Sequence, residues 1–209
     1  MGNRAVITTV KEWQNDGIGV YLHWNGGRDS VEAFLTYCKM KGYRAPDEDC
    51  YGWARLCQVI GNFFGGTTSV GIDKLWFLDK DNGDNGVYLL EGWDIAERFY
   101  HEGPEQQEYT MQEMLKAIDE AQPVKEQFGT EFWEAEETPT SELKVGDEVF
   151  VMSYGGEVSK EKIIGIGEDR VVNGTEVKGI PYIMKWMINN PAGNINNYLQ
   201  DETYRRVRK

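Results

Sequence analysis

The segment whose residue types could bind a ligand begins at Asn25, in the run N-G-G-R-D-S. It follows an apolar, β-branched segment and precedes residues with helical spacing, so it predicts a strand, a glycine turn and a helix N-terminus. Main-chain N–H groups and the helix dipole can bind a phosphate at such a turn. The cofactor-binding residues would then be Gly26, Gly27, Asp29 and Ser30. The opposing interpretation is that the two glycines only permit a tight corner between strand and helix.

The same run resembles the Ser-Gly-Gly-x-Asp-Ser loop of the PP-loop ATP pyrophosphatase family over six residues. That resemblance implies adenylation of a substrate by ATP with Mg²⁺. The run departs from the family pattern at its first position, where Asn25 replaces serine. The α/β fold of that family would place a parallel strand after the first helix, whereas this chain predicts a second helix there. We therefore favour the structural corner and keep a nucleotide-binding enzyme as the alternative.

Two further groups of residues could bind a metal or catalyse a reaction. Asp79, Asp81 and Asp84 lie close together in the chain, but the residues that an EF-hand needs at its sixth and twelfth positions are absent, and we predict a hairpin turn there. His23 and His101 lack the spacing of zinc ligands, and the chain has no recognisable nucleophile motif such as G-x-S-x-G. The sequence thus predicts no catalytic residue, no metal site and no cofactor.

The distribution of charge is the most distinctive property of the sequence. The chain has 35 acidic and 22 basic residues, which gives a net charge of −13. Residues 91–148 contain 17 of the acidic residues and four of the basic ones, so this acidic segment carries the whole net charge. A concentrated negative field repels nucleic acid and attracts basic protein surfaces across a Debye length of about 8 to 10 Å. The alternative interpretation is a solvated surface that improves solubility.

We predict that carboxylates of the acidic segment bind a basic surface of a partner protein. Carboxylates on helices and loops can imitate spaced phosphates, so the expected partner is a nucleic-acid-binding host or defence protein. The acidic segment itself is not expected to bind nucleic acid. The predicted partner-binding residues are Glu102, Glu105, Glu108, Glu113, Asp119, Glu120, Glu131, Glu134, Glu136 and Glu137.

The elements that would position these residues are those of an α+β protein. Strand-like residue patterns occur at residues 4–10, 18–24, 69–72, 75–78 and 87–90. The first two strands predict a hairpin. A first helix is expected with Asp29 as its N-cap and Gly42 at its end, and a second helix ends at Gly65. Thr110 and Glu113 form a capping box that predicts a third helix.

Three regions follow from these patterns. Residues 1–133 predict a mixed α/β sandwich with an acidic, helical C-terminal part, and the polar residues 134–143 predict a linker. Residues 144–209 contain short strands typical of a small SH3-like β-barrel. The run L-K-V-G-D-E-V-F-V resembles the first strand of SH3-like and KOW-type barrels. A third alternative for function is therefore an SH3-like module that binds nucleic acid or a peptide through its basic end, residues 205–209.

Through the runs Y-L-H-W-N-G-G and Q-V-I-G-N-F-F-G-G, the whole chain is similar to uncharacterised proteins of bacteria and their phages or mobile elements. That similarity implies no activity, but it implies a role in conflict between element and host, in which small acidic inhibitors such as anti-CRISPR proteins act. The apolar runs are far shorter than the roughly 20 residues of a membrane span, and no signal-peptide pattern is present, so we expect a cytoplasmic protein. We predict a non-enzymatic interaction protein that acts as an inhibitor or a nucleic-acid mimic.

Overall fold

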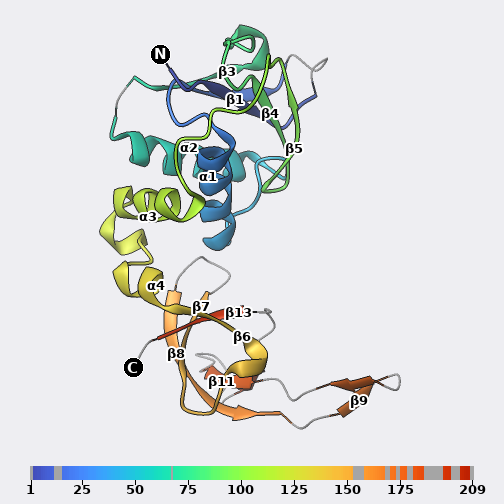
Figure 1. Ribbon diagram of the computed structural model, residues 1–209, viewed down its shortest axis with the longest axis vertical. Coiled ribbons are helices and arrows are strands. Elements are labelled where there is room, and N and C mark those ends of the chain that lie inside the picture. The colour runs from blue at the N-terminus through green and yellow to red at the C-terminus, as the bar shows by residue number, and fades with distance from the viewer. Residues whose placement is uncertain are drawn as a thin grey trace. The chain divides into compact units, whose positions relative to one another are not determined.

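The computed structural model describes residues 2–11, 16–66, 68–152, 158–167, 170–172, 175–177, 181–185, 195–198 and 203–207. The chain divides into an N-terminal unit, Met1–Gln127, and a C-terminal unit, Phe128–Lys209 (Figure 1). Helices and β-sheets both contribute to it, so the predicted α+β class is confirmed. Among the described helices, none combines the length and the apolar character that a membrane span requires.

The N-terminal unit is built on a mixed sheet with the strand order β3-β2-β1-β4-β5. Its strands are β1 (Ala5–Thr8), β2 (Ile18–Leu22), β3 (Val70–Lys74), β4 (Val87–Glu91) and β5 (Asp94–Phe99). Strand β1 pairs antiparallel with β2, which confirms the predicted hairpin. Strand β1 also pairs in parallel with β4, whereas the described pairs β2–β3 and β4–β5 are antiparallel.

The strand predicted at residues 75–78 and the hairpin predicted after it are wrong. Leu75–Phe77 form a 3-10 turn, η1, and β4 pairs with β1 rather than with this segment. Two Asn-Gly pairs between apolar runs indicate a hairpin locally, but the long-range pairing of β4 separates the two runs. Leu75 packs instead with Val6 and Val87 in a core cluster of the sheet.

Helices cover one side of this sheet (Figure 1). They are α1 (Arg28–Met40), α2 (Cys50–Phe64) and α3 (Met111–Ala121), and a 3-10 turn, η2 (Val124–Glu126), follows α3. Gly65 ends α2 in the left-handed conformation, with φ 63°, and the capping box of Thr110 and Glu113 begins α3, so both predictions are confirmed. The N-cap of α1 is Gly27, and the predicted N-cap, Asp29, lies in the first turn instead.

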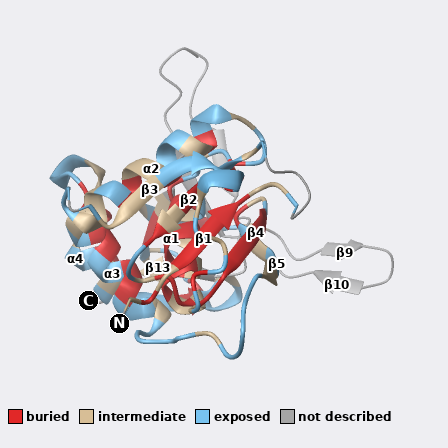
Figure 2. Cartoon of the chain, turned by 90° about the horizontal axis from the view of Figure 1, so that it is seen from above, coloured by how far each residue is buried: buried red, intermediate tan, exposed pale blue. Residues whose placement is uncertain are grey.

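The core of the N-terminal unit is centred on β1 and β4. All four residues of β1 are buried, as are the first four residues of β4 (Figure 2). Both strands lie in the middle of the sheet and are buried on both faces, so they read as continuous apolar runs rather than as alternating ones. This packing positions the start of β1 next to the loop that precedes β4, where the N–H of Asn85 donates to the carbonyl of Arg4.

The C-terminal unit is mainly antiparallel. Its elements are α4 (Thr130–Glu134), β6 (Glu136–Pro139), η3 (Thr140–Glu142), β7 (Glu148–Met152), β8 (Val158–Ile166), β9 (Arg170–Val172), β10 (Thr175–Val177), β11 (Pro181–Lys185), β12 (Ile195–Tyr198) and β13 (Thr203–Arg206). The main sheet has the order β12-β11-β8-β7-β13-β6, and β9 pairs with β10 in a separate ladder. The described strands form an open sheet, because β12 and β6 lie at its two ends, and the SH3-like barrel stays a prediction.

The boundary between the units lies between Gln127 and Phe128, before the predicted end of the first domain at residue 133. The predicted linker at residues 134–143 contains β6 and η3 instead, and β6 pairs with β13. The linker prediction rested on acidic and polar composition, which an edge strand shares, since charged side chains protect exposed strand edges.

Candidate interaction surface

The run N-G-G-R-D-S forms a corner that is packed by the chain's own backbone. The N–H of Gly26 donates to the carbonyl of Asn3 (2.8 Å), and a Cβ on Gly26 would lie 2.6 Å from the nitrogen of Ala5. A Cβ on Gly27 would overlap the carbonyl oxygen of Gln106. Both glycines are buried, and both are needed for the close approach of neighbouring segments. The corner interpretation explains them fully.

The main-chain N–H and the carboxylate of Asp29 form hydrogen bonds within the protein, whereas the buried hydroxyl of Ser30 has no hydrogen-bond partner among the described residues. The N–H of Asp29 donates to Oε1 of Gln107 (2.8 Å). The carboxylate of Asp29 accepts the main-chain N–H of Ser30 (2.7 Å), Glu108 (3.0 Å) and Tyr109 (2.6 Å). A phosphate at this helix N-terminus would also meet the negative charge of that carboxylate. The geometry therefore favours the structural corner over the nucleotide-binding alternative.

The predicted partner-binding carboxylates divide between the two units and between two environments. In the N-terminal unit, Asp119 is buried and accepts a hydrogen bond from the hydroxyl of Tyr37 (2.8 Å). Burial and this hydrogen bond raise the pKa of the Tyr37 hydroxyl above its ordinary value. Asp119 was therefore wrongly included among the contact residues, because Tyr37 satisfies its carboxylate inside the core.

Two further carboxylates of the N-terminal unit have structural roles. Glu105 accepts from Nε of Arg28 (2.8 Å) and lies 4.0 Å from Nε of Arg98. Glu113 accepts the N–H of Thr110 (3.0 Å) and so completes the capping box of α3. Both charges are partly compensated within the fold, by guanidinium groups in the first case and by the helix N-terminus in the second.

In the C-terminal unit, internal pairing engages carboxylates on α4 and β6. Glu131 pairs with Lys160, and Glu136 pairs with Arg206 (2.8 Å). Glu137 lies opposite Arg205 in the register of β6 and β13. Two consecutive glutamates of β6 thus lie opposite two consecutive arginines of β13, which the linker prediction for this segment did not anticipate.

The remaining predicted carboxylates are exposed and make no ion pair with any residue that the structure describes. They are Glu102, Glu108 and Glu120 in the N-terminal unit and Glu134 in the C-terminal unit. The ten predicted residues are thus reduced to a smaller set whose charge the fold does not use.

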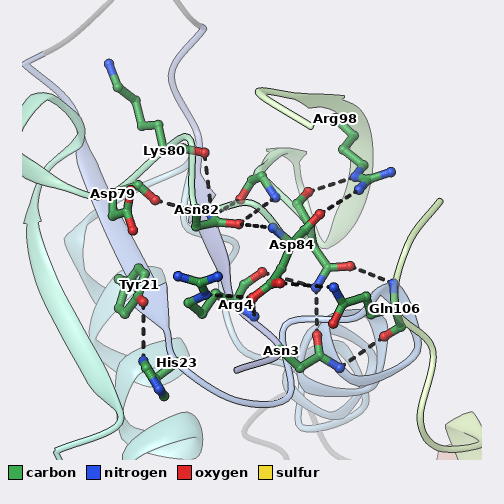
Figure 3. A network of polar contacts seen from close by, with 12 residues as sticks. Asn3, Arg4, Tyr21, His23, Asp79, Lys80, Asn82, Asp84, Arg98 and Gln106 are labelled. Carbon is green, nitrogen blue, oxygen red and sulfur yellow. Dashed lines mark hydrogen bonds and ion pairs between the residues drawn. The ribbon is translucent and has the colours of Figure 1, made fainter. Parts of the chain in front are cut away.

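The loop at residues 79–86 is held by the buried side chain of Asn82 (Figure 3). Its Nδ2 donates to the carbonyls of Asp79 (3.2 Å) and Gly86 (3.1 Å), and its Oδ1 accepts the N–H of Asp84 and Gly86 at 3.1 Å. The two Asn-Gly pairs thus build a loop around one asparagine. No group of three or more His, Cys, Asp or Glu residues within the described part of the chain is placed to hold a metal ion.

Asp84 connects this loop to the beginning of the chain (Figure 3). Its carboxylate accepts from the N–H of Arg4 (3.1 Å), from Nε of Arg4 (2.6 Å) and from Nε2 of Gln106 (3.0 Å). Burial opposes ionisation of Asp84, but these hydrogen bonds outweigh it and hold the pKa of the carboxyl below its ordinary value. Next to it, Nδ2 of Asn85 donates to Oδ1 of Asn3 (2.6 Å). This network stabilises the fold and leaves Asp84 engaged with Arg4.

An exposed aromatic cluster lies where η1 and the end of β5 approach the same loop. We define this Lys80 cluster as Trp76, Phe77, Lys80 and Tyr100. Nζ of Lys80 lies 5.4 Å from the centroid of the Trp76 ring and 5.2 Å from that of the Tyr100 ring. The exposed fractions are 62% for Trp76, 69% for Phe77 and 37% for Tyr100. Large aromatic side chains that remain this exposed are typical of interaction sites.

Tyr100 adopts a backbone conformation that disfavours side chains other than those of glycine and asparagine, with φ 55°. This left-handed conformation costs about 1–2 kcal/mol for an ordinary residue. A Cβ on Gly86 would overlap the carbonyls of Phe99 and Tyr100, so the chain turns closely against Gly86 at this point. A tyrosine therefore occupies a position whose backbone conformation favours glycine, and its ring contacts Lys80.

The Lys80 cluster does not follow from the local sequence pattern. A strand at residues 75–78 would have placed Trp76 and Phe77 on opposite faces of a sheet, with one of them buried. In η1, Leu75 is buried and the two aromatic side chains that follow it are exposed. A usable signal was the succession of Trp76, Phe77 and a lysine three residues later, since cations and aromatic rings attract each other. The position of Tyr100 depends on β5 and has no local signal.

Comparison with protein-family models, with curated proteins and with solved structures gives no match for this chain.

Proposed function

We propose that this protein is a non-enzymatic binding protein whose acidic surface docks on a basic surface of a nucleic-acid-binding partner. The observation that carries the proposal is the set of exposed carboxylates that no described basic side chain neutralises. In the N-terminal unit these are Glu102, Glu108 and Glu120. This unit has 21 acidic and 12 basic residues and a net charge of −9. Repulsion among these negative charges destabilises the folded unit, and the same charges attract a basic partner.

The chemistry of the partner follows from the charge. A surface of spaced carboxylates competes with phosphates for lysine and arginine side chains, so an inhibitor or nucleic-acid mimic of a phage or mobile element, directed against a host or defence protein, is the role that we propose. Exposed carboxylates act mainly on the association rate and on specificity, and both fall as salt screens the charges. Such binding requires no catalytic residue and no cofactor.

The alternative of an SH3-like module that binds through its basic end receives less support from the described residues. Arg206 pairs with Glu136 (2.8 Å) and approaches Asp147 (3.7 Å), and Arg205 stacks over two aromatic rings of its own unit. Arginines held in this way are less available to a phosphate than the exposed carboxylates are to a basic side chain.

A capture experiment with matched charge variants tests the proposal. The full chain is immobilised on a support and incubated with bacterial lysate at low and at high salt. The affinity of each identified partner is then measured for the wild type and for Glu102→Gln/Glu108→Gln/Glu120→Gln. We expect an affinity loss of about tenfold, or about 1.4 kcal/mol, because three attractive charges are removed at constant shape.

The control variant removes the same charge elsewhere, with Asp16→Asn, Glu48→Gln and Asp73→Asn, all at exposed positions outside the acidic segment. It should change the affinity by less than about twofold. Binding that is indifferent to salt and to both triple variants would contradict the proposal. Stabilisation of the wild type by ATP and Mg²⁺, abolished by Asp29→Ala, would favour the nucleotide-binding alternative instead.

A further inference from the structure

The exposed rings of the Lys80 cluster are large enough to anchor a partner. Trp, Tyr and Phe side chains each bury about 150–250 Å² when they are covered and dominate the energetics of protein interfaces. Trp76 and Phe77 are more than half exposed and adjacent in η1. Leu75, the first residue of η1, packs in the core, so the turn that presents both rings is fixed to the sheet. A rigid presentation reduces the entropy that binding must overcome.

The cluster already binds a cation of its own. The ammonium of Lys80 lies 5.4 Å from the Trp76 ring and 5.2 Å from the Tyr100 ring, within the distance of a cation–π contact in both cases. An aromatic ring has two faces, and these rings are 62% and 37% exposed. An arginine of a partner can therefore stack on them as well. Arginine suits this role better than lysine, because its guanidinium is planar and less strongly hydrated.

The charges next to the cluster favour a basic occupant. Asp79 and Asp81 flank Lys80 in the loop that Asn82 holds, and both are exposed. Glu102 follows Tyr100 by two residues, and it is also exposed. These three carboxylates lie within two residues of Lys80 or Tyr100 in the sequence and outnumber the positive charge of Lys80 in the cluster. A charged rim next to exposed aromatic side chains is typical of an interaction site.

We propose that Trp76, Phe77 and Tyr100 form the anchor of the docking surface and that their occupant is an arginine-bearing segment of the basic partner. This inference rests on the proposed function, because it names where on the N-terminal unit that partner binds. The strained backbone of Tyr100 is consistent with it, since strain persists where a side chain must be placed for binding.

Defined peptides test this inference without a known partner. The probes are fluorescent, end-capped nona-arginine and nona-lysine, which carry equal charge but differ in their ability to stack. Their affinities for the full chain are measured by anisotropy at low salt. The wild type should prefer nona-arginine, and Trp76→Ala/Tyr100→Ala should lose about tenfold in affinity for nona-arginine together with most of the preference.

A matched variant controls for the loss of exposed aromatic area. Trp24 and Tyr51 are 43% and 65% exposed, and Arg44 lies 5.8 Å from the Tyr51 ring, so Trp24→Ala/Tyr51→Ala removes similar groups outside the cluster. It should change neither affinity by more than about twofold. If the alanine variant of the cluster unfolds, Trp76→Leu/Tyr100→Leu and Trp76→Phe/Tyr100→Phe decide the question: only the phenylalanine pair should keep the preference for arginine.

Two results would overturn the inference: equal affinity of the wild type for both peptides, or a preference that survives removal of both rings. The charge variants separate this failure from failure of the proposed function. If Glu102→Gln/Glu108→Gln/Glu120→Gln weakens both peptides equally while the aromatic variants have no effect, the acidic surface binds but the anchor is elsewhere. If neither set of variants changes any affinity, both proposals fail.

Discussion

Each unit of the protein holds a basic side chain against two aromatic rings, and the two clusters differ in what covers the rings. In the C-terminal unit, the guanidinium of Arg205 lies 4.8 Å from the Phe132 ring centroid and 5.3 Å from that of Trp133. Phe132 is buried, stacks on Phe128 at 4.6 Å and contacts the ring of Phe150 at 5.4 Å. The cation therefore covers one side of an aromatic core.

The Lys80 cluster of the N-terminal unit uses the same chemistry, with rings that are more exposed. The Trp76 and Tyr100 rings contact Lys80, and Tyr100 also contacts the ring of Phe99 at 5.5 Å, but Trp76 and Phe77 are largely exposed. The comparison shows that a cation–π contact alone does not reveal the role of a cluster. Where the rings join helix α4 to strand β13, the contact supports the fold; where they remain exposed, their apolar surface is available to a partner.

Truncation of a ring should have the largest effect, and the effect should differ between the two clusters. Phe132→Ala is expected to destabilise the C-terminal unit by about 3–5 kcal/mol, because it leaves a cavity among packed rings. Phe77→Ala should change the stability of the N-terminal unit by less than about 0.5 kcal/mol, since the side chain is already exposed. Hydrogen exchange, resolved on β7 and β8 for one unit and on β1 and β4 for the other, measures the two effects separately. Equal losses of protection would contradict the assignment of separate roles.

Local signals predicted much of the N-terminal unit. The hairpin of β1 and β2, the end of α2 at Gly65 and the capping box of Thr110 and Glu113 each depend on residues close together in the chain. The position of β4 depends instead on pairing with β1, about eighty residues away, which no local pattern encodes. Composition also misled the linker prediction for residues 134–143, since a charged edge strand and a linker are composed alike.

The candidate surface could be predicted only in outline, because neutralisation of a charge depends on distant residues. Asp119 meets Tyr37 from 82 positions away in the sequence, and Glu105 meets Arg28 from 77 positions away. The sequence shows that the segment is acidic. Local residues do not determine which of its carboxylates remain exposed, because the partners lie far away in the chain. The Lys80 cluster was missed for the same reason, since it joins η1 to the end of β5.

The loop that carries Lys80 contains two aspartates that differ in the same way, one mostly buried and paired and the other exposed. Asp84 has 8% of its side chain exposed and pairs with Arg4, whereas Asp81 is exposed. The folded-state pKa of Asp84 lies below its ordinary value, so its contribution to stability is present above the unfolded-state pKa and is lost as the pH falls through the folded-state pKa. Asp84→Asn should lower stability near neutral pH by about 1.5 kcal/mol and flatten the acid limb of the profile.

Urea unfolding of the N-terminal unit across acidic and neutral pH measures this effect, and Asp81→Asn is the matched control, because it neutralises an exposed carboxylate of the same loop. Its profile should follow that of the wild type. If both variants flatten the acid limb alike, the hydrogen bonds from Arg4 do not set the difference between the two aspartates.

Removal of the basic side chain from each cluster should have the smallest effect on the free energy of unfolding, and this effect should differ between the two units. Arg205→Ala should destabilise the C-terminal unit by about 1 kcal/mol, whereas Lys80→Ala should cost the N-terminal unit less than about 0.5 kcal/mol, because its contacts are solvated. Lys80→Ala should also raise the affinity for nona-arginine, since it frees two ring faces and removes a like charge from the anchor. An affinity that falls instead would mean that the lysine itself contacts the partner, and the rings would then serve to position its ammonium rather than to receive a guanidinium.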